Sequence, residues 1–187
     1  MKILIVFCYH KLYKFFKKQL LTIKNNCIDI LKKNNTVNIA CVSSFNNYSF
    51  IEEICGNIKY KIHSDEKQII KMIKCVSHLK SVNDTDYDWV IKLRPDLEIN
   101  EKITESIFEK CDKNCLNSRI RFYSGLEINV KNGTSCDEKL GGKGSYIYSE
   151  TIKTIVPDDM IFIMHKNALF DLCKEVCDEE FLEDKII

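Results

Sequence analysis

A basic and acidic motif follows one apolar segment of this sequence. Residues 89–93, WVIKL, lead into Arg94, Pro95 and Asp96, and Arg94 is one of only three arginines in the chain. Proline has no N–H to donate and fixes its backbone angle, so Pro95 ends a strand and holds Asp96 at the strand end. A carboxylate held there suits a divalent cation. Arg94, with Lys92 on the same strand face, suits a diphosphate or an ion pair with Asp96.

The other proline of the chain also precedes aspartates. Pro157 is followed by Asp158 and Asp159, and an apolar segment, residues 160–164, comes next. Carboxylates beside a second strand, facing the same pocket, would provide a second metal ligand or a general base. We therefore take Asp159, and after it Asp158, as the candidate base. The simpler alternatives are a surface ion pair for the first motif and the cap of a turn for the second.

Alternating strand and helix patterns position these motifs. Apolar, β-branched segments predict strands and amphipathic segments predict helices. The predicted strands are 2–8, 36–42, 58–62, 89–93, 119–123, 146–148 and 159–164; the predicted helices are 11–33, 64–80 with Ser64 as N-cap, 102–110 and 167–181. This alternation predicts an α/β fold around a mostly parallel, Rossmann-like sheet. Such sheets bind ligands outside the carboxyl ends of their strands, which is where residues 94–96 fall.

Composition narrows the classes of function. The 187 residues predict a single domain, 1–187, with 45% hydrophobic and 29% charged residues. A net charge of +1 argues against binding to nucleic acid or to an anionic membrane, because such binding needs a basic excess. The chain has no apolar run of about 20 residues, so we expect no membrane span. The first 18 residues have no signal-peptide cleavage site, which predicts a cytoplasmic protein with its ten cysteines reduced.

Two segments carry a resemblance to a known family. Residues 87–97, YDWVIKLRPDL, resemble the YDxVIRxRPDL segment of certain nucleotide-sugar glycosyltransferase-like proteins with GT-A-type domains. Residues 157–165, PDDMIFIMH, are similar to the DDQFFIG segment of that family. The first segment is similar in place to the metal-binding DxD motif, but Arg94 stands where the first aspartate would be. The resemblance implies a GT-A-like three-layer sandwich.

The resemblance also implies a function and roles for individual residues. It implies a glycosyltransferase that moves a sugar from a nucleoside-diphosphate sugar to a carbohydrate or glycan acceptor. Asp96 would bind a divalent cation, Mn or Mg, or the ribose and diphosphate region. Arg94 and Lys92 would bind the diphosphate or hold Asp96, and Asp159 would be the base. Tyr9, at the end of the first strand, would stack on the nucleotide base.

Two alternatives stay open at the level of sequence. The chain is an inactive nucleotide-sugar-binding or interaction domain if the missing first aspartate abolishes turnover. It is a nuclease if Pro95-Asp96 combines with Asp137-x-Lys139 as a PD-(D/E)xK motif. The second alternative is the weaker one, because 137–139 lie in a segment containing Gly and Ser instead of a predicted strand, and because the charge is balanced.

Overall fold

The computed structural model describes residues 1–46, 48–114, 117–122 and 155–169, and the side chains of residues 69, 118–122 and 155–160 are outside this description. The strands are β1 (Lys2–Tyr9), β2 (Thr36–Ser43), β3 (Tyr60–His63), β4 (Trp89–Leu93), β5 (Asn117–Phe122) and β6 (Ile155–His165). The helical segments are η1 (Lys14–Phe16), α1 (Lys17–Ile23), η2 (Lys24–Ile28), α2 (Asp29–Leu31), α3 (Ser49–Cys55), α4 (Gln68–Ser81) and α5 (Ser106–Lys110).

The chain divides into two compact units. One comprises Met1–Asn117 and Asp159–Glu180, and the other comprises Ser118–Asp158 and Phe181–Ile187. The first unit contains β1 to β4, most of β6 and all of the helical segments named above. The second unit contains β5 beyond its first residue and the beginning of β6. All of the side-chain geometry below belongs to the first unit.

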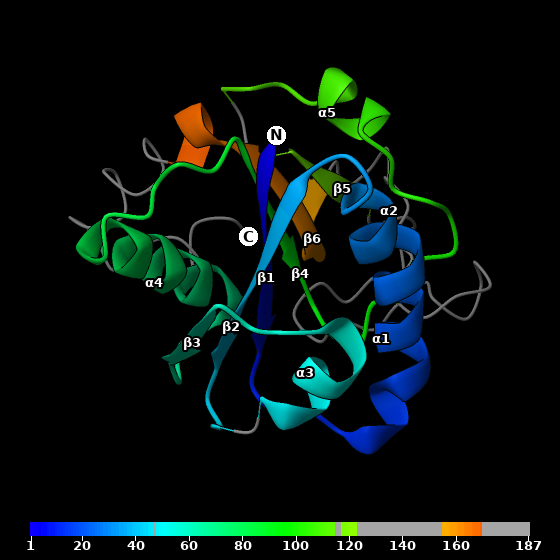
Figure 1. Ribbon diagram of the computed structural model, residues 1–187, viewed down its shortest axis with the longest axis vertical. Coiled ribbons are helices and arrows are strands. Elements are labelled where there is room, and N and C mark those ends of the chain that lie inside the picture. The colour runs from blue at the N-terminus through cyan, green and yellow to red at the C-terminus, as the bar shows by residue number, and fades with distance from the viewer. Residues whose placement is uncertain (47, 115–116, 123–154, 170–187) are drawn as a thin grey trace. The chain divides into compact units, whose positions relative to one another are not determined.

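β1 lies at the centre of the sheet of the first unit, whose order is β3-β2-β1-β4-β6 (Figure 1). β1 pairs in parallel with both β2 and β4, and β3 pairs in parallel with β2. β6 runs antiparallel to β4, with Trp89 opposite His165. The chain lays β2 and β3 on one side of β1 and then returns to place β4 on the other side. The strand order therefore reverses between β1 and β4, which makes their carboxyl ends a topological switch point.

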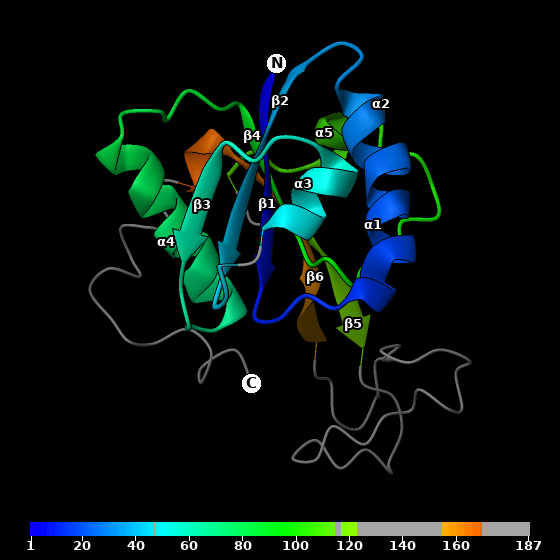
Figure 2. The ribbon, with the colours of Figure 1, turned by 60° about the horizontal axis from the view of Figure 1, so that its bottom comes forward.

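Helices cover both faces of this sheet. Side chains alternate along β1, so that Ile3, Ile5 and Phe7 pack in one core with residues of α1, η2 and α3. Leu4, Val6 and Cys8 pack in a second core with residues of α4. Figure 2 shows α4 on one side of the strands, with α1 and α3 on the other. The prediction of an α/β fold with a mostly parallel sheet is confirmed.

Most predicted elements of the first unit are confirmed. The strands predicted at 2–8, 36–42, 58–62 and 89–93 correspond to β1, β2, β3 and β4. The amphipathic segment 11–33 is helical from Lys14, but it begins with a 3-10 turn and contains a π turn at Lys24–Ile28. The predicted helix 102–110 is shorter, since α5 begins at Ser106. The strand predicted at 146–148 and most of the helix predicted at 167–181 lie outside the described residues.

One predicted helix boundary was wrong, and one helix was not predicted. Ser64 is not an N-cap, because α4 begins four residues later, after Lys67. The backbone of Ser64 instead continues the β2–β3 pairing, with its N–H donating to Ser43 O at 2.9 Å. The sequence reading also missed α3, which ends at Gly56 with a φ of 97° that side chains disfavour.

Two further expectations concern the described part of the chain. Six cysteines there carry free thiols: Cys8, Cys27, Cys41, Cys55, Cys75 and Cys111. Among the helices of the described residues, none is both long enough and apolar enough to cross a bilayer.

Candidate ligand-binding site

A pocket of about 370 Å³ opens at the topological switch point. Its lining comes from the end of β1 and the turn after it, from the start of α4 and from the segment after β4. The lining residues are Tyr9, His10, Lys11, Tyr13, Phe16, Gln68, Arg94, Pro95 and Asp96. The volume falls in the range of small-molecule sites, and the position is where open α/β sheets bind ligands. We call this the carboxyl-edge pocket.

Arg94 and Asp96 form a bidentate ion pair on the wall of this pocket. Arg94 Nε donates to Asp96 Oδ1 at 3.0 Å and Nη2 donates to Asp96 Oδ2 at 2.7 Å. The buried Pro95 lies between them, and the N–H of Leu97 closes the turn onto Arg94 O at 3.2 Å. Both side chains keep about 30% exposure, so the pair faces the pocket while it is held in place. Arg94 and Asp96 are thus paired, which is one of the arrangements expected from the sequence, and the contact of Arg94 with a diphosphate stays a prediction.

The two other predicted binding residues are more buried than the sequence suggests. Tyr9 lines the pocket but is 4% exposed and belongs to the core under α1, so its stacking on a base stays a prediction. Lys92 is completely buried, and its Nζ lies 5.0 Å from the centre of the Phe162 ring. It is absent from the described lining of the pocket, and its contact with a diphosphate stays a prediction.

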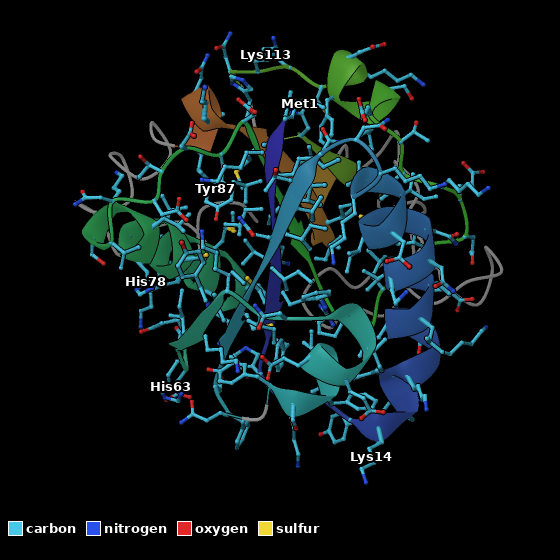
Figure 3. The ribbon with its side chains drawn as sticks, in the orientation of Figure 1. Met1, Lys14, His63, His78, Tyr87 and Lys113 are labelled. Atoms are coloured by element: carbon cyan, nitrogen blue, oxygen red, sulfur yellow. The ribbon has the colours of Figure 1, made fainter. Side chains whose placement is uncertain are left out.

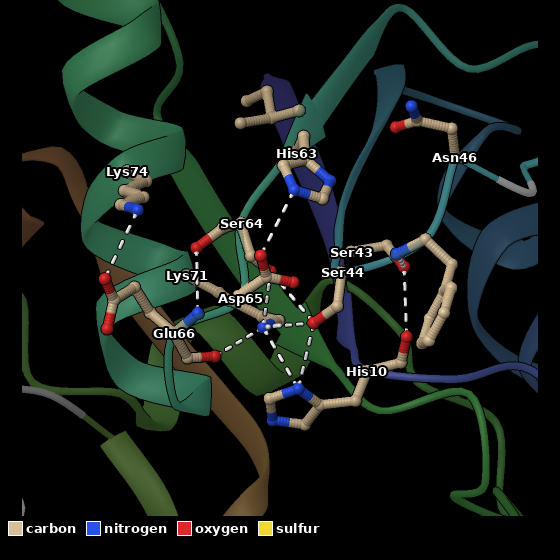
Figure 4. Close-up of polar contacts among 12 residues, drawn as sticks. His10, Ser43, Ser44, Asn46, His63, Ser64, Asp65, Glu66, Lys71 and Lys74 are labelled. Carbon is tan, nitrogen blue, oxygen red and sulfur yellow. Dashed lines mark hydrogen bonds and ion pairs between the residues drawn. The ribbon is translucent and has the colours of Figure 1, made fainter.

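A polar cluster joins the pocket to α4, and sequence reasoning missed it (Figure 4). Lys71 is completely buried, and its Nζ donates to Ser64 O at 2.7 Å and to Glu66 O. The same Nζ lies 3.2 Å from Ser44 Oγ and 3.4 Å from His10 Nδ1. We call His10, Ser44, Ser64 and Lys71 the carboxyl-edge cluster. It ties the His10 wall of the pocket to the ends of β2 and β3.

Two buried ammonium groups make the interior near the end of β1 electropositive. Burial raises the pKa of the Cys8 thiol to about 12, and the charges of Lys92 and Lys71 oppose that effect. Burial also lowers the pKa of Lys71 from its ordinary value. Within the described part of the chain, Lys71 is hydrogen-bonded to carbonyl, hydroxyl and imidazole groups, while the carboxylates of Asp65 and Glu66 act on it electrostatically. This local field favours an anionic ligand in the adjoining pocket.

Gln68 lines the pocket and carries one polar atom without a partner in the described part of the chain. Its Oε1 is buried and has no hydrogen-bond partner among the described residues. A buried amide oxygen without a partner costs on the order of 1–3 kcal/mol. Gln68 is also the first residue of α4, whose N-terminal end favours negative charge.

The candidate base lies largely outside the description. Asp158 and Asp159 belong to the backbone of β6, but their side chains are not among the described residues. The structure therefore does not bring them to the pocket or separate them from it. Their role as base stays a prediction.

The described residues do not by themselves fit a divalent cation. Among the described lining residues, Asp96 is the one carboxylate, and both of its oxygens accept from Arg94. The part of the chain that is described holds no group of three His, Cys, Asp or Glu side chains placed to bind a metal. Mg²⁺ is commonly held by one or two carboxylates together with water and substrate phosphates, and the one described carboxylate here is already paired with Arg94. Binding of Mn or Mg by Asp96 stays a prediction.

The fold and the pocket together define an α/β protein with a pocket at the switch point of its sheet. No protein-family model and no curated protein matches this chain.

Proposed function

We propose that this protein binds a nucleoside-diphosphate sugar in the carboxyl-edge pocket and transfers the sugar to a carbohydrate acceptor. The observation that carries the proposal is the combination of aromatic and basic side chains around one pocket at the switch point. Tyr13 and Phe16 offer rings for a base, while Lys11 and Arg94 offer charge for phosphates. The resemblance of residues 87–97 to nucleotide-sugar glycosyltransferase-like proteins supports the same ligand class.

The chemistry of the proposed reaction follows from where charge develops. The bond between the anomeric carbon and the diphosphate oxygen breaks, and the acceptor oxygen forms the new bond to that carbon. The departing diphosphate gathers negative charge, which Arg94 and Lys11 would stabilise. The acceptor hydroxyl passes its proton to a base, a role we assign to Asp159, with Asp158 as the second candidate.

A second candidate function is binding of the same ligand without turnover. One observation favours it: both oxygens of Asp96, the described carboxylate of the pocket, accept hydrogen bonds from Arg94. A carboxylate that is engaged in this way is a weaker proton acceptor and a weaker metal ligand. In this alternative the pair serves to orient the guanidinium toward the diphosphate.

A panel of UDP-glucose, UDP-N-acetylglucosamine and GDP-mannose, with and without manganese, tests the proposal. We expect at least one donor to raise the melting temperature of the protein and to release its nucleoside diphosphate. Arg94→Gln should weaken binding about tenfold, the loss expected for one charged hydrogen bond. Lys80→Gln, an exposed lysine at the far end of α4, is the matched control and should leave binding unchanged.

The outcomes separate the two candidate functions. Binding without nucleotide release would favour the non-catalytic alternative. If Asp96→Asn and Asp159→Asn both leave turnover intact, the roles assigned to these carboxylates are wrong. If no member of the panel binds, the ligand class is wrong.

A further inference from the structure

An exposed aromatic group marks the junction between β1 and α1. Phe15 is 70% exposed and Tyr13 is 42% exposed, and η1 contains no buried residue. The rings pack against each other: Tyr13 and Phe15 stack with centroids 5.1 Å apart, and Phe15 meets Phe16 edge-on at 4.4 Å. A contiguous group of exposed rings marks an interaction surface more often than isolated apolar residues do.

Lysines surround these rings. Lys11, Lys14, Lys17 and Lys18 are all exposed, and the first 28 residues of the chain contain no Asp or Glu. Lys18 is paired with Glu98, with 2.9 Å between Lys18 Nζ and Glu98 Oε1. Lys11 Nζ lies 5.1 Å from the centre of the Tyr13 ring. Figure 3 shows Lys14 pointing away from the ribbon at the start of this helical segment. We call residues 11–18 the basic–aromatic patch. The balanced net charge of the whole chain therefore conceals a local basic excess.

We propose that the basic–aromatic patch docks the protein on the surface of an anionic membrane. The argument is charge complementarity combined with exposed rings. Lysines beside aromatic side chains suit the boundary between headgroups and acyl chains, where rings insert and ammonium groups reach lipid phosphates. A protein bound in this way lies on the membrane surface and needs no membrane-spanning helix.

The patch fits a lipid surface better than the other anionic partners. A nucleic acid would need a wider basic surface than the chain offers, since its charges otherwise balance. A small ligand in the carboxyl-edge pocket does not explain Lys14, Phe15 and Lys17, which are not among the residues that line the described pocket. The inference is therefore independent of the proposed function. Lys11, Tyr13 and Phe16 belong to both surfaces, so docking would bring the pocket next to the lipid.

Co-sedimentation with lipid vesicles tests this inference on the full chain. We expect binding to phosphatidylcholine vesicles that contain about 30% phosphatidylglycerol, and little binding to pure phosphatidylcholine. Lys14→Gln with Lys17→Gln should lower the partition coefficient about 25-fold, at about fivefold for each lysine. Phe15→Ser should lower it about tenfold.

Matched controls lie elsewhere on the surface. Lys32→Gln with Lys33→Gln removes two exposed lysines from the far end of the same helical segment, and Val82→Ser removes an exposed apolar residue after α4. Both should leave partitioning unchanged. Equal partitioning of the wild type onto the two kinds of vesicle would overturn the inference. So would equal losses in the patch and control variants, or capture of an RNA oligonucleotide, but of no vesicles, by the wild type.

Discussion

The charged groups at the two ends of the parallel strands have different partners. At the amino end, one carboxylate gathers several donors: Asp84 accepts from Lys2 Nζ at 2.9 Å, Lys59 Nζ at 2.6 Å and Tyr87 Oη at 3.0 Å, and also from the Tyr60 hydroxyl. We call these five residues the amino-edge network. Figure 3 shows Tyr87 in the half of the molecule nearer Met1, with Lys14 near the opposite end.

At the carboxyl end, the hydrogen-bond partners of the buried Lys71 are neutral groups, and the carboxylates of Asp65 and Glu66 act on it only electrostatically. The Lys71 ammonium is hydrogen-bonded to carbonyl, hydroxyl and imidazole groups, and Gln68, which lines the adjoining pocket, has a buried Oε1 without a hydrogen-bond partner among the described residues. The carboxylate of Asp84 in the amino-edge network accepts hydrogen bonds from within the fold, so we expect this network to stabilise the folded protein. The carboxyl-edge cluster holds the buried Lys71 ammonium next to the pocket, an arrangement that suits the anionic ligand we propose. Substitutions at the two ends should therefore separate stability from binding.

The largest effect on stability is expected at the amino end. Asp84→Ala removes the common acceptor of the amino-edge network and leaves the buried Tyr87 hydroxyl with fewer partners. We expect the free energy of unfolding to fall by about 3 kcal/mol, measured by urea denaturation. Asp86→Ala, an exposed aspartate of the same loop, is the control and should change stability by less than about 0.5 kcal/mol. Loss of ligand affinity in folded Asp84→Ala protein would break the comparison.

Lys71→Met should affect both properties. The carbonyl oxygens of Ser64 and Glu66 lose their donor, while the cost of burying a charge disappears, so we expect a net loss of about 2 kcal/mol. Affinity for the nucleotide-sugar panel should fall at least about fivefold, because the local positive field is lost. Lys74→Met, on the same helix but half exposed, is the control. Unchanged affinity in Lys71→Met would show that the carboxyl-edge cluster is purely structural.

Lowering the pH should reduce the stability that the amino-edge network contributes. Hydrogen bonds from Lys59 and Tyr60 hold the pKa of Asp84 below its ordinary value of 3.8. A carboxyl whose pKa is lowered by folding stabilises the protein above its unfolded pKa, and this contribution is lost as the pH falls. We expect a loss of about 1 kcal/mol between about pH 5 and pH 3 in the wild type. Asp84→Asn should be less stable at neutral pH but should show a flatter decline, and parallel curves would contradict this account.

The smallest effect is expected at an exposed ion pair near the pocket. His63 Nε2 lies 3.4 Å from Asp65 Oδ2, and both side chains are more than half exposed. Pairs of this kind contribute little, so His63→Gln should change stability by less than about 0.5 kcal/mol and leave ligand binding unchanged. A change above about 1 kcal/mol in urea denaturation would show that the carboxyl end also depends on surface charge.

The strands were predictable from sequence, because a central strand such as β1 must be apolar on both faces. The pair formed by Arg94 and Asp96 was predictable for a similar reason: Pro95 leaves the backbone little freedom, and the two side chains are two residues apart. The end of α3 was also signalled, since Gly56 permits a φ that other residues disfavour.

Lys71 was not predictable in the same way. Its hydrogen bonds join α4 to the ends of β1, β2 and β3, and only the folded chain brings these segments together. Its place four residues before the buried Cys75 is the one local sign that it lies on the inner face of α4. The orphaned Oε1 of Gln68 depends likewise on tertiary packing. Long-range polar contacts of this kind leave no periodic pattern in a sequence.

The most direct test of the central claim is an NMR titration of the full chain with UDP-glucose and, separately, with GDP-mannose. If the carboxyl-edge pocket is the ligand site, at least one donor will shift the backbone amide resonances of residues 9–16, Arg94 and Asp96 and the side-chain amide of Gln68. The resonances of residues 84–87, at the amino end, will stay in place. Shifts centred on residues 84–87, or no shifts with either donor, would contradict the claim.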